Sequence, residues 1–308
     1  MFYGIGENKN NQSLIPSVFS FTIIAVICRI LVNPFSNVLQ KQIAIKGQHP
    51  LFINLTTYLL LAFISLFLIK DISIHSLDKA FWIYSIAGGI TGALGNGFIV
   101  KALEKGDLSV LGPINAYKSI IGMLFAYILI RELPNVWGII GMALIIMGSY
   151  FVLDTTEEKF SWTLFKLPAI QYRLAALILT GIQAVLDKKV IEHSNLTIAF
   201  AGWSIFGAGF SLIFILFTKV SLTAEAKKIN TKIWIKYLLL VVTVGLMLAS
   251  TNYTLSHMPV GYALALFQLS ILLTVILGHR FFNEQHLIKK LIGASIMIFG
   301  SVLIILLK

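Results

Sequence analysis

The sequence carries little charge for its length. Only 12% of its 308 residues are Asp, Glu, Lys or Arg, whereas 57% are hydrophobic. Soluble globular domains carry roughly 25% charged residues, so this composition excludes a sizeable soluble domain. The single cysteine, Cys28, excludes a disulfide within the chain.

Acidic residues are the scarcer of the two charge types. The chain has 13 Asp and Glu against 24 Lys and Arg, which gives a formal net charge of +11. In a soluble protein this excess would indicate a nucleic-acid partner. Here the cations lie mostly at the ends of apolar runs, where they anchor the loops of a membrane protein. We therefore expect the lipid bilayer, and no nucleic acid, as a partner.

The motifs of an enzyme are missing as well. The six histidines lie in different segments without metal-ligand spacing, and no Gly-Lys-Ser/Thr loop for a nucleotide phosphate is present. The spacing also supports no Ser–His–Asp set. We expect no enzymatic activity, no metal and no cofactor.

The chain does contain a series of apolar runs near 20 residues, each long enough to cross ~30 Å of hydrocarbon. We predict an all-α integral membrane protein with ten transmembrane helices. Their expected ranges are 17–40, 50–69, 80–103, 108–130, 135–153, 170–190, 196–218, 233–255, 260–281 and 287–307.

An internal repeat divides the ten expected helices into two sets of five. A shift of 152 residues matches Trp82 with Trp234, Glu132 with Glu284, Gly141 with Gly293 and Gly148 with Gly300, and a shift of 147 matches Lys41 with Lys188. We expect a polar tail at 1–16, a first repeat at 17–153, a loop at 154–169 and a second repeat at 170–308. Because five is odd, the second repeat is inverted, an arrangement typical of secondary transporters with a substrate site near the midplane.

The segments from Ala102 to Leu153 and from Tyr253 to Ile304 resemble the two EamA-type repeats of the drug/metabolite transporter superfamily. Each contains a helix of small residues, a terminal Glu, and a helix with two spaced glycines. The resemblance implies a ten-helix carrier with a central cavity. It leaves the substrate open, because members move amino acids, sugars, nucleotide sugars, sugar phosphates and drugs. Related small multidrug exporters carry a Glu in the first helix, where this chain has Arg29, which argues against lipophilic cations.

Polar residues follow one face of the first expected helix. Arg29, Asn33, Asn37 and Lys41 are spaced by four residues, and Pro34 lies among them. This stripe, with a proline that permits a kink, favours a water-filled cavity. The alternatives are that the asparagines join neighbouring helices and that Lys41 reaches the membrane interface.

Lys118 is the only charge in the run from Leu108 to Ile130, and it lies near mid-membrane. The roughly 15 Å to either interface, at 1.5 Å per residue, exceeds the reach of a lysine side chain. Lys118, with Asn115 and Tyr117 beside it, is therefore expected to face protein or water. It is either a cation that holds an anionic or zwitterionic substrate or a buried structural lysine.

The second half supplies a different set of polar groups. Gln183 and Asp187 lie in the sixth expected helix, while Gln268 and Ser270 lie in the ninth, where Ser270 is the repeat equivalent of Lys118. Asp187 is the candidate for coupling to protons, the alternative being a solvated helix end. We expect Glu132 and Glu284 to form caps or ion pairs at the interface.

We predict a secondary active carrier that works by alternating access and moves a small polar metabolite, anionic or zwitterionic, such as an amino acid, organic acid or phosphorylated compound. The expected substrate-binding residues are Arg29, Asn33, Asn37, Asn115, Tyr117, Lys118, Gln183, Gln268 and Ser270. The alternatives are a sugar-phosphate or nucleotide-sugar exchanger, a drug/metabolite exporter, and a membrane sensor or scaffold that transports nothing. We expect a multi-pass monomer or homodimer in a bacterial cytoplasmic membrane. Lys/Arg counts place both termini outside, whereas the resemblance implies both inside.

Overall fold

The computed structural model describes residues 10–70, 77–118, 120–121, 135–156, 162–218 and 220–306. Every regular element among these residues is a helix. Eight stretches of them are long and apolar enough to cross a membrane. These are α1 (Asn10–Ala44), α2 (Pro50–Ile69), α3 (Lys79–Lys105), α6 (Val136–Leu153), α8 (Leu196–Leu216), α10 (Thr231–His257), α11 (Val260–Phe267) continued by α12 (Ser270–Phe282), and α13 (Leu287–Leu306).

The expectation of ten membrane-crossing helices is thus confirmed for eight. The sixth expected range is present as the helix α7 (Pro168–Glu192), which is not among these eight stretches. The fourth expected range begins as α4 (Leu108–Leu111) and the 3-10 helix η1 (Pro113–Ala116). Residues 122–134, which include Glu132, lie outside the described part of the chain. The short helices η2 (Trp162–Lys166) and α9 (Leu222–Lys227) lie in connecting segments.

Two helices that we expected to be continuous change their winding near the middle. After α4 the chain tightens into η1 at Pro113, which has no backbone N–H to donate. The turn between α11 and α12 is tightened as well, since Ile271 N bonds to Gln268 O at 2.9 Å over three residues. At the 152-residue shift the residues of η1 correspond to 265–268, so both halves carry the irregularity at equivalent places.

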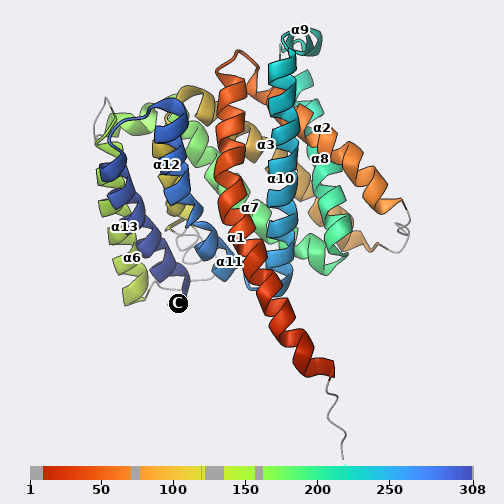
Figure 1. Ribbon diagram of the computed structural model, residues 1–308, viewed down its shortest axis with the longest axis horizontal. Coiled ribbons are helices and arrows are strands. Elements are labelled where there is room, and N and C mark those ends of the chain that lie inside the picture. The colour runs from red at the N-terminus through yellow and green to blue at the C-terminus, as the bar shows by residue number, and fades with distance from the viewer. Residues whose placement is uncertain are drawn as a thin grey trace, which may run out of the picture.

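The helices of the two halves pack in a symmetric pattern. The closest pairings are α3 with α7, α1 with α10, α2 with α8 and α6 with α13. Under the sequence repeat, α1 corresponds to α7, α3 to α10, α2 to α8 and α6 to α13. Exchanging the halves therefore turns the α3–α7 pair into the α10–α1 pair and leaves the other two pairs unchanged. In Figure 1 the α6–α13 pair lies at one flank, α2 and α8 at the other, and α1, α3, α7 and α10 between them.

Glycines set the contact between α6 and α13. A Cβ atom on Gly141 would lie 2.6 Å from the carbonyl oxygen of Gly300, and one on Gly148 would lie 2.6 Å from that of Gly293. Only glycine permits this approach, because a methyl group would overlap the opposite backbone. Under the sequence repeat, Gly141 is equivalent to Gly293 and Gly148 is equivalent to Gly300. Exchanging the two halves therefore turns the Gly141–Gly300 contact into the Gly148–Gly293 contact.

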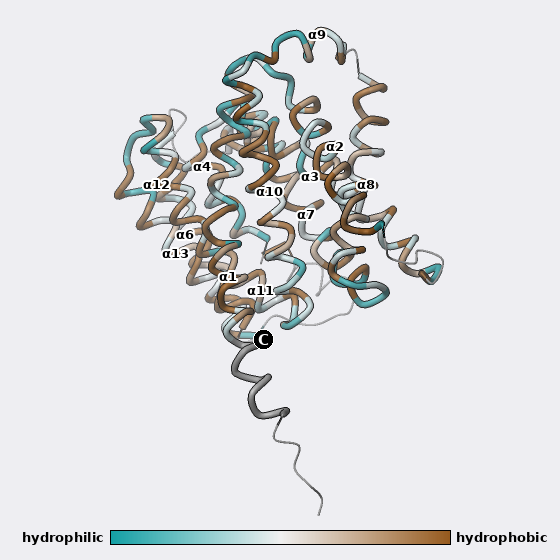
Figure 2. Tube along the Cα trace, turned by 45° about the vertical axis from the view of Figure 1, so that its right-hand side comes forward, coloured by the Kyte–Doolittle hydropathy of each residue, from teal (hydrophilic) through white to brown (hydrophobic). Residues whose placement is uncertain are grey.

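The outer surface of the bundle is apolar, as a lipid-facing surface requires. Figure 2 shows hydrophobic stretches along the helices and hydrophilic ones mainly toward their ends. The repeat-related Trp82 and Trp234 are each 40% exposed, so both lie at the outer surface of the bundle. Helix α1 continues unbroken through Pro34, in agreement with the single helix expected over 17–40.

Candidate functional site

A cavity of about 150 Å³ lies in the centre of the bundle, between the two halves. Helices α1 and α3 and the segment from η1 to Lys118 line it from the first half, and α7, α8, α10 and α11 from the second. Its polar lining comprises Arg29, Asn33, Asn37, Asn96, Asn115, Lys118, Arg173, Thr180, Gln183, Asp187 and Thr251. Seven of the ten side chains predicted from the sequence as binding or coupling groups are thus in one place.

Arg29 of α1 is only partly satisfied by the protein. Its Nε donates to Thr251 Oγ1 at 2.9 Å, and its guanidinium lies 5.0 Å from the centre of the Phe267 ring. Its Nη1 is buried without a hydrogen-bond partner among the described residues. A buried donor left unpaired is costly, so this nitrogen is available for an acceptor inside the cavity.

Lys118 reaches the cavity across the surface of α7. A Cβ atom on Gly181 would lie 3.7 Å from Lys118 Cγ, so the glycine leaves room for the lysine stem in ordinary contact. The half-buried Lys118 makes no hydrogen bond or ion pair with any residue in the described ranges. The alternative of a lysine held by an internal ion pair, with Asp187 for instance, is not seen among these residues.

Arg173 is a third cation in the lining, and the sequence analysis missed it. Its Nε donates to the carbonyl oxygen of Leu111 at 2.8 Å, just before the irregular segment η1. Its position only three residues inside the sixth expected helix made it resemble an anchor at the membrane interface. Its signal in the sequence was a charge inside an expected span, the same signal that singled out Lys118.

The irregular segments of the two halves meet beside the cavity. Asn115 in η1 donates to Gln268 Oε1 at 3.4 Å, and Asn33 of α1 donates to Ser270 Oγ at 3.5 Å. Gln268 and Ser270 therefore contact the asparagines of the cavity from behind, and neither is part of the described lining. Discontinuous helices of this kind supply the polar groups of substrate sites in many transporters.

Tyr117 differs from its expectation. Its hydroxyl donates to Ser149 Oγ of α6 at 2.8 Å, and its ring packs against the apolar core beside α6 and α13. It follows Asn115 and precedes Lys118 in sequence but points away from the cavity, because helical winding turns neighbouring residues to different faces.

Two smaller cavities adjoin the central one. One of about 40 Å³ is lined by amides and hydroxyls, among them Gln40, Asn54, Thr57 and Tyr58, and shares Asn33, Asn37 and Asn96 with the central cavity. The other, of about 10 Å³, is lined by Ser85, Asp187 and Asn252. Trp203 lines all three, and its ring lies 4.4 Å from that of Tyr58, so it has a place in the cavity wall as well as in packing.

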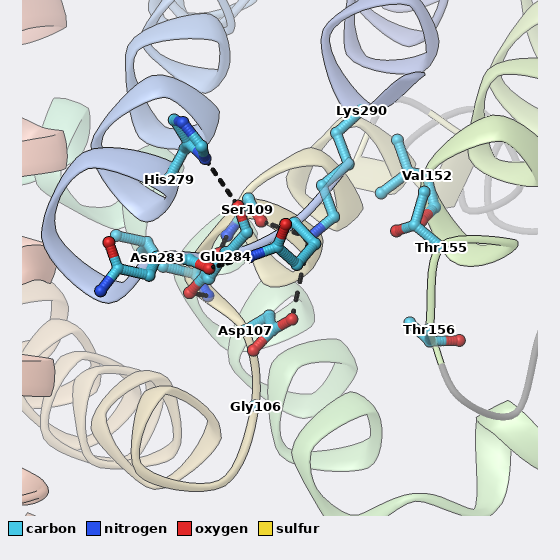
Figure 3. A network of polar contacts seen from close by, with 12 residues as sticks. Gly106, Asp107, Ser109, Val152, Thr155, Thr156, His279, Asn283, Glu284 and Lys290 are labelled. Atoms are coloured by element: carbon cyan, nitrogen blue, oxygen red, sulfur yellow. Dashed lines mark hydrogen bonds and ion pairs between the residues drawn. The ribbon is translucent and has the colours of Figure 1, made fainter. Parts of the chain in front are cut away.

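A buried polar network joins the halves at the ends of α3 and α12 (Figure 3). Glu284 accepts from Lys41 Nζ at 2.9 Å and from the backbone N–H groups of Leu108 and Ser109 at 2.8 Å each. Lys41 also donates to the carbonyl oxygen of Gly106 at 2.8 Å, where α3 ends. Glu284 thus forms an ion pair and caps the backbone N–H groups of Leu108 and Ser109. It is buried in the protein, whereas we expected it at the interface. Lys41, only 8% exposed, does not reach the interface.

The repeat equivalent of Lys41 makes a related contact. Lys188 of α7 donates to the carbonyl oxygen of Leu255, in the last turn of α10. Each lysine thus reaches the C-terminal end of the third helix in its own half, where the helix dipole favours a cation. Neither Lys41 nor Lys188 lines the central cavity.

The largest hollow, about 610 Å³, lies beside this network and is lined by helix ends and loop residues such as Asp107, Thr156 and Gln285. The central cavity is smaller, but three cations line it, and none of them forms an ion pair among the described residues. We therefore take the central cavity as the candidate site.

Comparison with known proteins agrees with this architecture. The family model described as the EamA-like transporter family matches residues 20–154 and 167–306, one match for each half. A solved crystal structure that is 15% identical aligns over 94% of this chain and 97% of its own, with a TM-score of 0.64, which shows a shared fold. No curated protein matches the sequence. The two family matches cover most of the chain, and the protein is a multi-pass membrane protein that belongs to the EamA-like transporter family, within the drug/metabolite transporter superfamily.

Proposed function

We propose that the protein is a secondary carrier that moves a small polar metabolite with a negative group, anionic or zwitterionic, by alternating access through the central cavity. In this proposal the chain crosses the membrane ten times as two inverted five-helix repeats. The observation that carries it is the presence, between the two halves, of a cavity lined by three cations, of which Arg29 has a buried Nη1 without a hydrogen-bond partner among the described residues.

The roles of individual residues follow from their contacts. Arg29 and Lys118 attract the negative group, because both are cations that line the cavity and Arg29 Nη1 is buried without an acceptor among the described residues. Asn33, Asn37, Asn115 and Gln183 orient the rest of the substrate through their amides, backed by Gln268 and Ser270. The symmetric packing of the halves supports alternating access, since rocking one half against the other exposes a central site to each side in turn.

Asp187 is the proposed coupling residue. It lies where the central cavity meets the 10 Å³ cavity, whose Ser85 Oγ and Asn252 Nδ2 are buried without partners among the described residues. That volume is close to the space of one water molecule. A carboxylate in the membrane interior without a cationic partner favours taking up a proton, so this place suits proton coupling. We place the protein in a bacterial cytoplasmic membrane, where a proton gradient would drive it.

Uptake into proteoliposomes tests the proposal. Vesicles containing the purified protein should take up or exchange metabolites that raise its melting temperature, and Lys118→Met should reduce uptake by about tenfold or more, the worth of one charged hydrogen bond. Lys101→Met is the matched control, because Lys101 lies 5.4 Å from the Tyr172 ring and outside the cavity. Ligand binding without uptake or exchange for any metabolite would instead support a sensor or scaffold.

A further inference from the structure

The central cavity holds an excess of positive charge. Three cationic side chains, Arg29, Lys118 and Arg173, face one carboxylate, Asp187, which leaves a formal charge of +2 on the described lining in the state in which Asp187 is ionised. All three cations line one cavity of about 150 Å³, so their charges lie near one another. Like charges gathered in the membrane interior are costly unless something neutralises them.

The protein itself does not neutralise the cluster within its described residues. Asp187 forms no ion pair there, and it lies on the side of the 10 Å³ cavity, where a Cβ on Gly88 would be 3.8 Å from its Oδ1. The hydrogen bonds of Arg29 and Arg173 go to a threonine hydroxyl and a backbone carbonyl, which are neutral acceptors. Lys118 Nζ has no acceptor among the described residues.

We infer that the species bound in the central cavity carries a net charge of −2, either as two carboxylates or as one phosphate monoester. This inference rests on the proposed function and narrows its substrate class. A dianion cancels the +2 of the lining and gives both Arg29 and Arg173 an anionic partner. A monoanion leaves one charge uncompensated, and a zwitterion leaves two. Asn33, Asn37 and Asn96 face the neutral polar part of the solute and continue into the 40 Å³ cavity of amides and hydroxyls.

The first test compares ligands of similar shape and different charge on the full-length protein. Succinate and succinamate share a skeleton but carry −2 and −1, while glycerol 3-phosphate and alanine represent a phosphate monoester and a zwitterion. At pH ~7.5, thermal-shift titrations should give at least one of the two dianions an affinity about tenfold or more above succinamate and alanine. Which dianion binds more tightly distinguishes a dicarboxylate from a phosphate substrate. Equal affinities for succinate and succinamate, with no preference for glycerol 3-phosphate over alanine, would overturn the inference.

The second test removes one charge from the site. Arg173→Gln should lower the preference for the dianion over the monoanion by about tenfold, whereas Arg173→Lys, which keeps the charge, should retain it. Lys101→Gln removes a cation outside the cavity and should leave the preference unchanged. If folded Arg173→Gln keeps the same preference for the dianion over the monoanion, the role given to this residue is contradicted. A residue with a merely structural role would not change this preference when substituted.

The two proposals fail in different ways. Uptake of succinamate or alanine into proteoliposomes, without binding or uptake of either dianion, contradicts the dianion inference and leaves the carrier proposal standing. Binding without uptake or exchange of any probe contradicts the carrier proposal itself. If glycerol 3-phosphate binds, its affinity for Asp187→Asn, whose described lining has no carboxyl to titrate, should fall as the pH is lowered through ~6, because the monoester then loses one of its two charges. A constant affinity over this range would show that the monoanion suffices.

Discussion

At the scale of single residues, the carboxyl group of Asp187 allows a direct test of energy coupling. We expect Asp187→Asn to bind solute but to lose uptake driven by an imposed pH gradient, because the amide takes up no proton. Counterflow exchange, which needs no net proton movement, should persist. The measurement is gradient-driven uptake against exchange in the same proteoliposomes. Asp78→Asn is the control, because Asp78 is an exposed residue that caps α3 and pairs with His193. Retained gradient-driven uptake in Asp187→Asn would exclude this coupling role.

The depth of a charge along its own helix could be judged from the sequence, and its partners could not. Arg29 and Lys118 lie far from either end of an apolar run, so their exclusion from lipid follows from local spacing, and the structure places both in the cavity. Arg173 and Lys41 lie near the ends of expected helices, where the membrane interface is a simple explanation for a charge. Lys41 is buried beside its ion-pair partner Glu284, which lies 243 residues away in sequence. Such a contact depends on how the halves meet, which no local pattern contains.

At the scale of helices, the glycine contacts between α6 and α13 should be intolerant of a single methyl group. Gly148→Ala places a Cβ 2.6 Å from Gly293 O and 2.7 Å from Met297 Cγ, and the backbone oxygen cannot move aside cheaply. Overpacking of this kind costs ~1–3 kcal/mol, and we expect a lower melting temperature in detergent. Gly209→Ala in α8 is the matched control, because nothing lies within 4 Å of its added Cβ. Equal melting temperatures would mean that α6 and α13 pack differently.

Helix positions were predictable because the length of each long apolar run has to match the thickness of the membrane. The bounds of α2 agree with the expected range, and α13 ends within one residue of it. The irregular turn between α11 and α12 was not foreseen, since Gln268 and Leu269 are not helix-breaking residues. Pro113 could have indicated the tightening at η1. The repeat would then have placed a similar irregularity in the second half.

At the scale of the whole molecule, Glu284 ties the second half to the first. Burial raises the pKa of its carboxyl, but the Lys41 ammonium and the hydrogen bonds from Lys41 and Ser109 outweigh burial, so the pKa lies below its ordinary value. A carboxyl with a lowered pKa stabilises the folded state above its unfolded pKa, and this contribution is lost as the pH falls through the folded value. We expect the melting temperature to drop at acidic pH, and Glu284→Gln to weaken that drop.

The same substitution should lower stability at neutral pH. Removing one partner of a buried ion pair costs ~3–5 kcal/mol, whereas Glu192→Gln, in the exposed pair with Lys189, should change stability little. Thermal unfolding at pH ~7 compares the two variants. Similar losses in both would show that Lys41 and Glu284 contribute no more than a surface pair.

Alternating access gives the Lys41–Glu284 pair a second consequence. The pair joins α1 of the first half to the α12–α13 turn of the second, so it has to break when the halves separate on this face. Glu284→Gln weakens the link and should favour the conformation open to this side. A cysteine at Gln40, which is buried in the 40 Å³ cavity, reports the opening in a Cys28→Ser background. A loss of ~1.4 kcal/mol in the stability of the closed conformation raises the population of the open conformation about tenfold. We therefore expect a membrane-impermeant maleimide to label Gln40→Cys about tenfold faster with Glu284→Gln than with Glu192→Gln. Equal labelling rates would show that this pair stabilises the fold without controlling access.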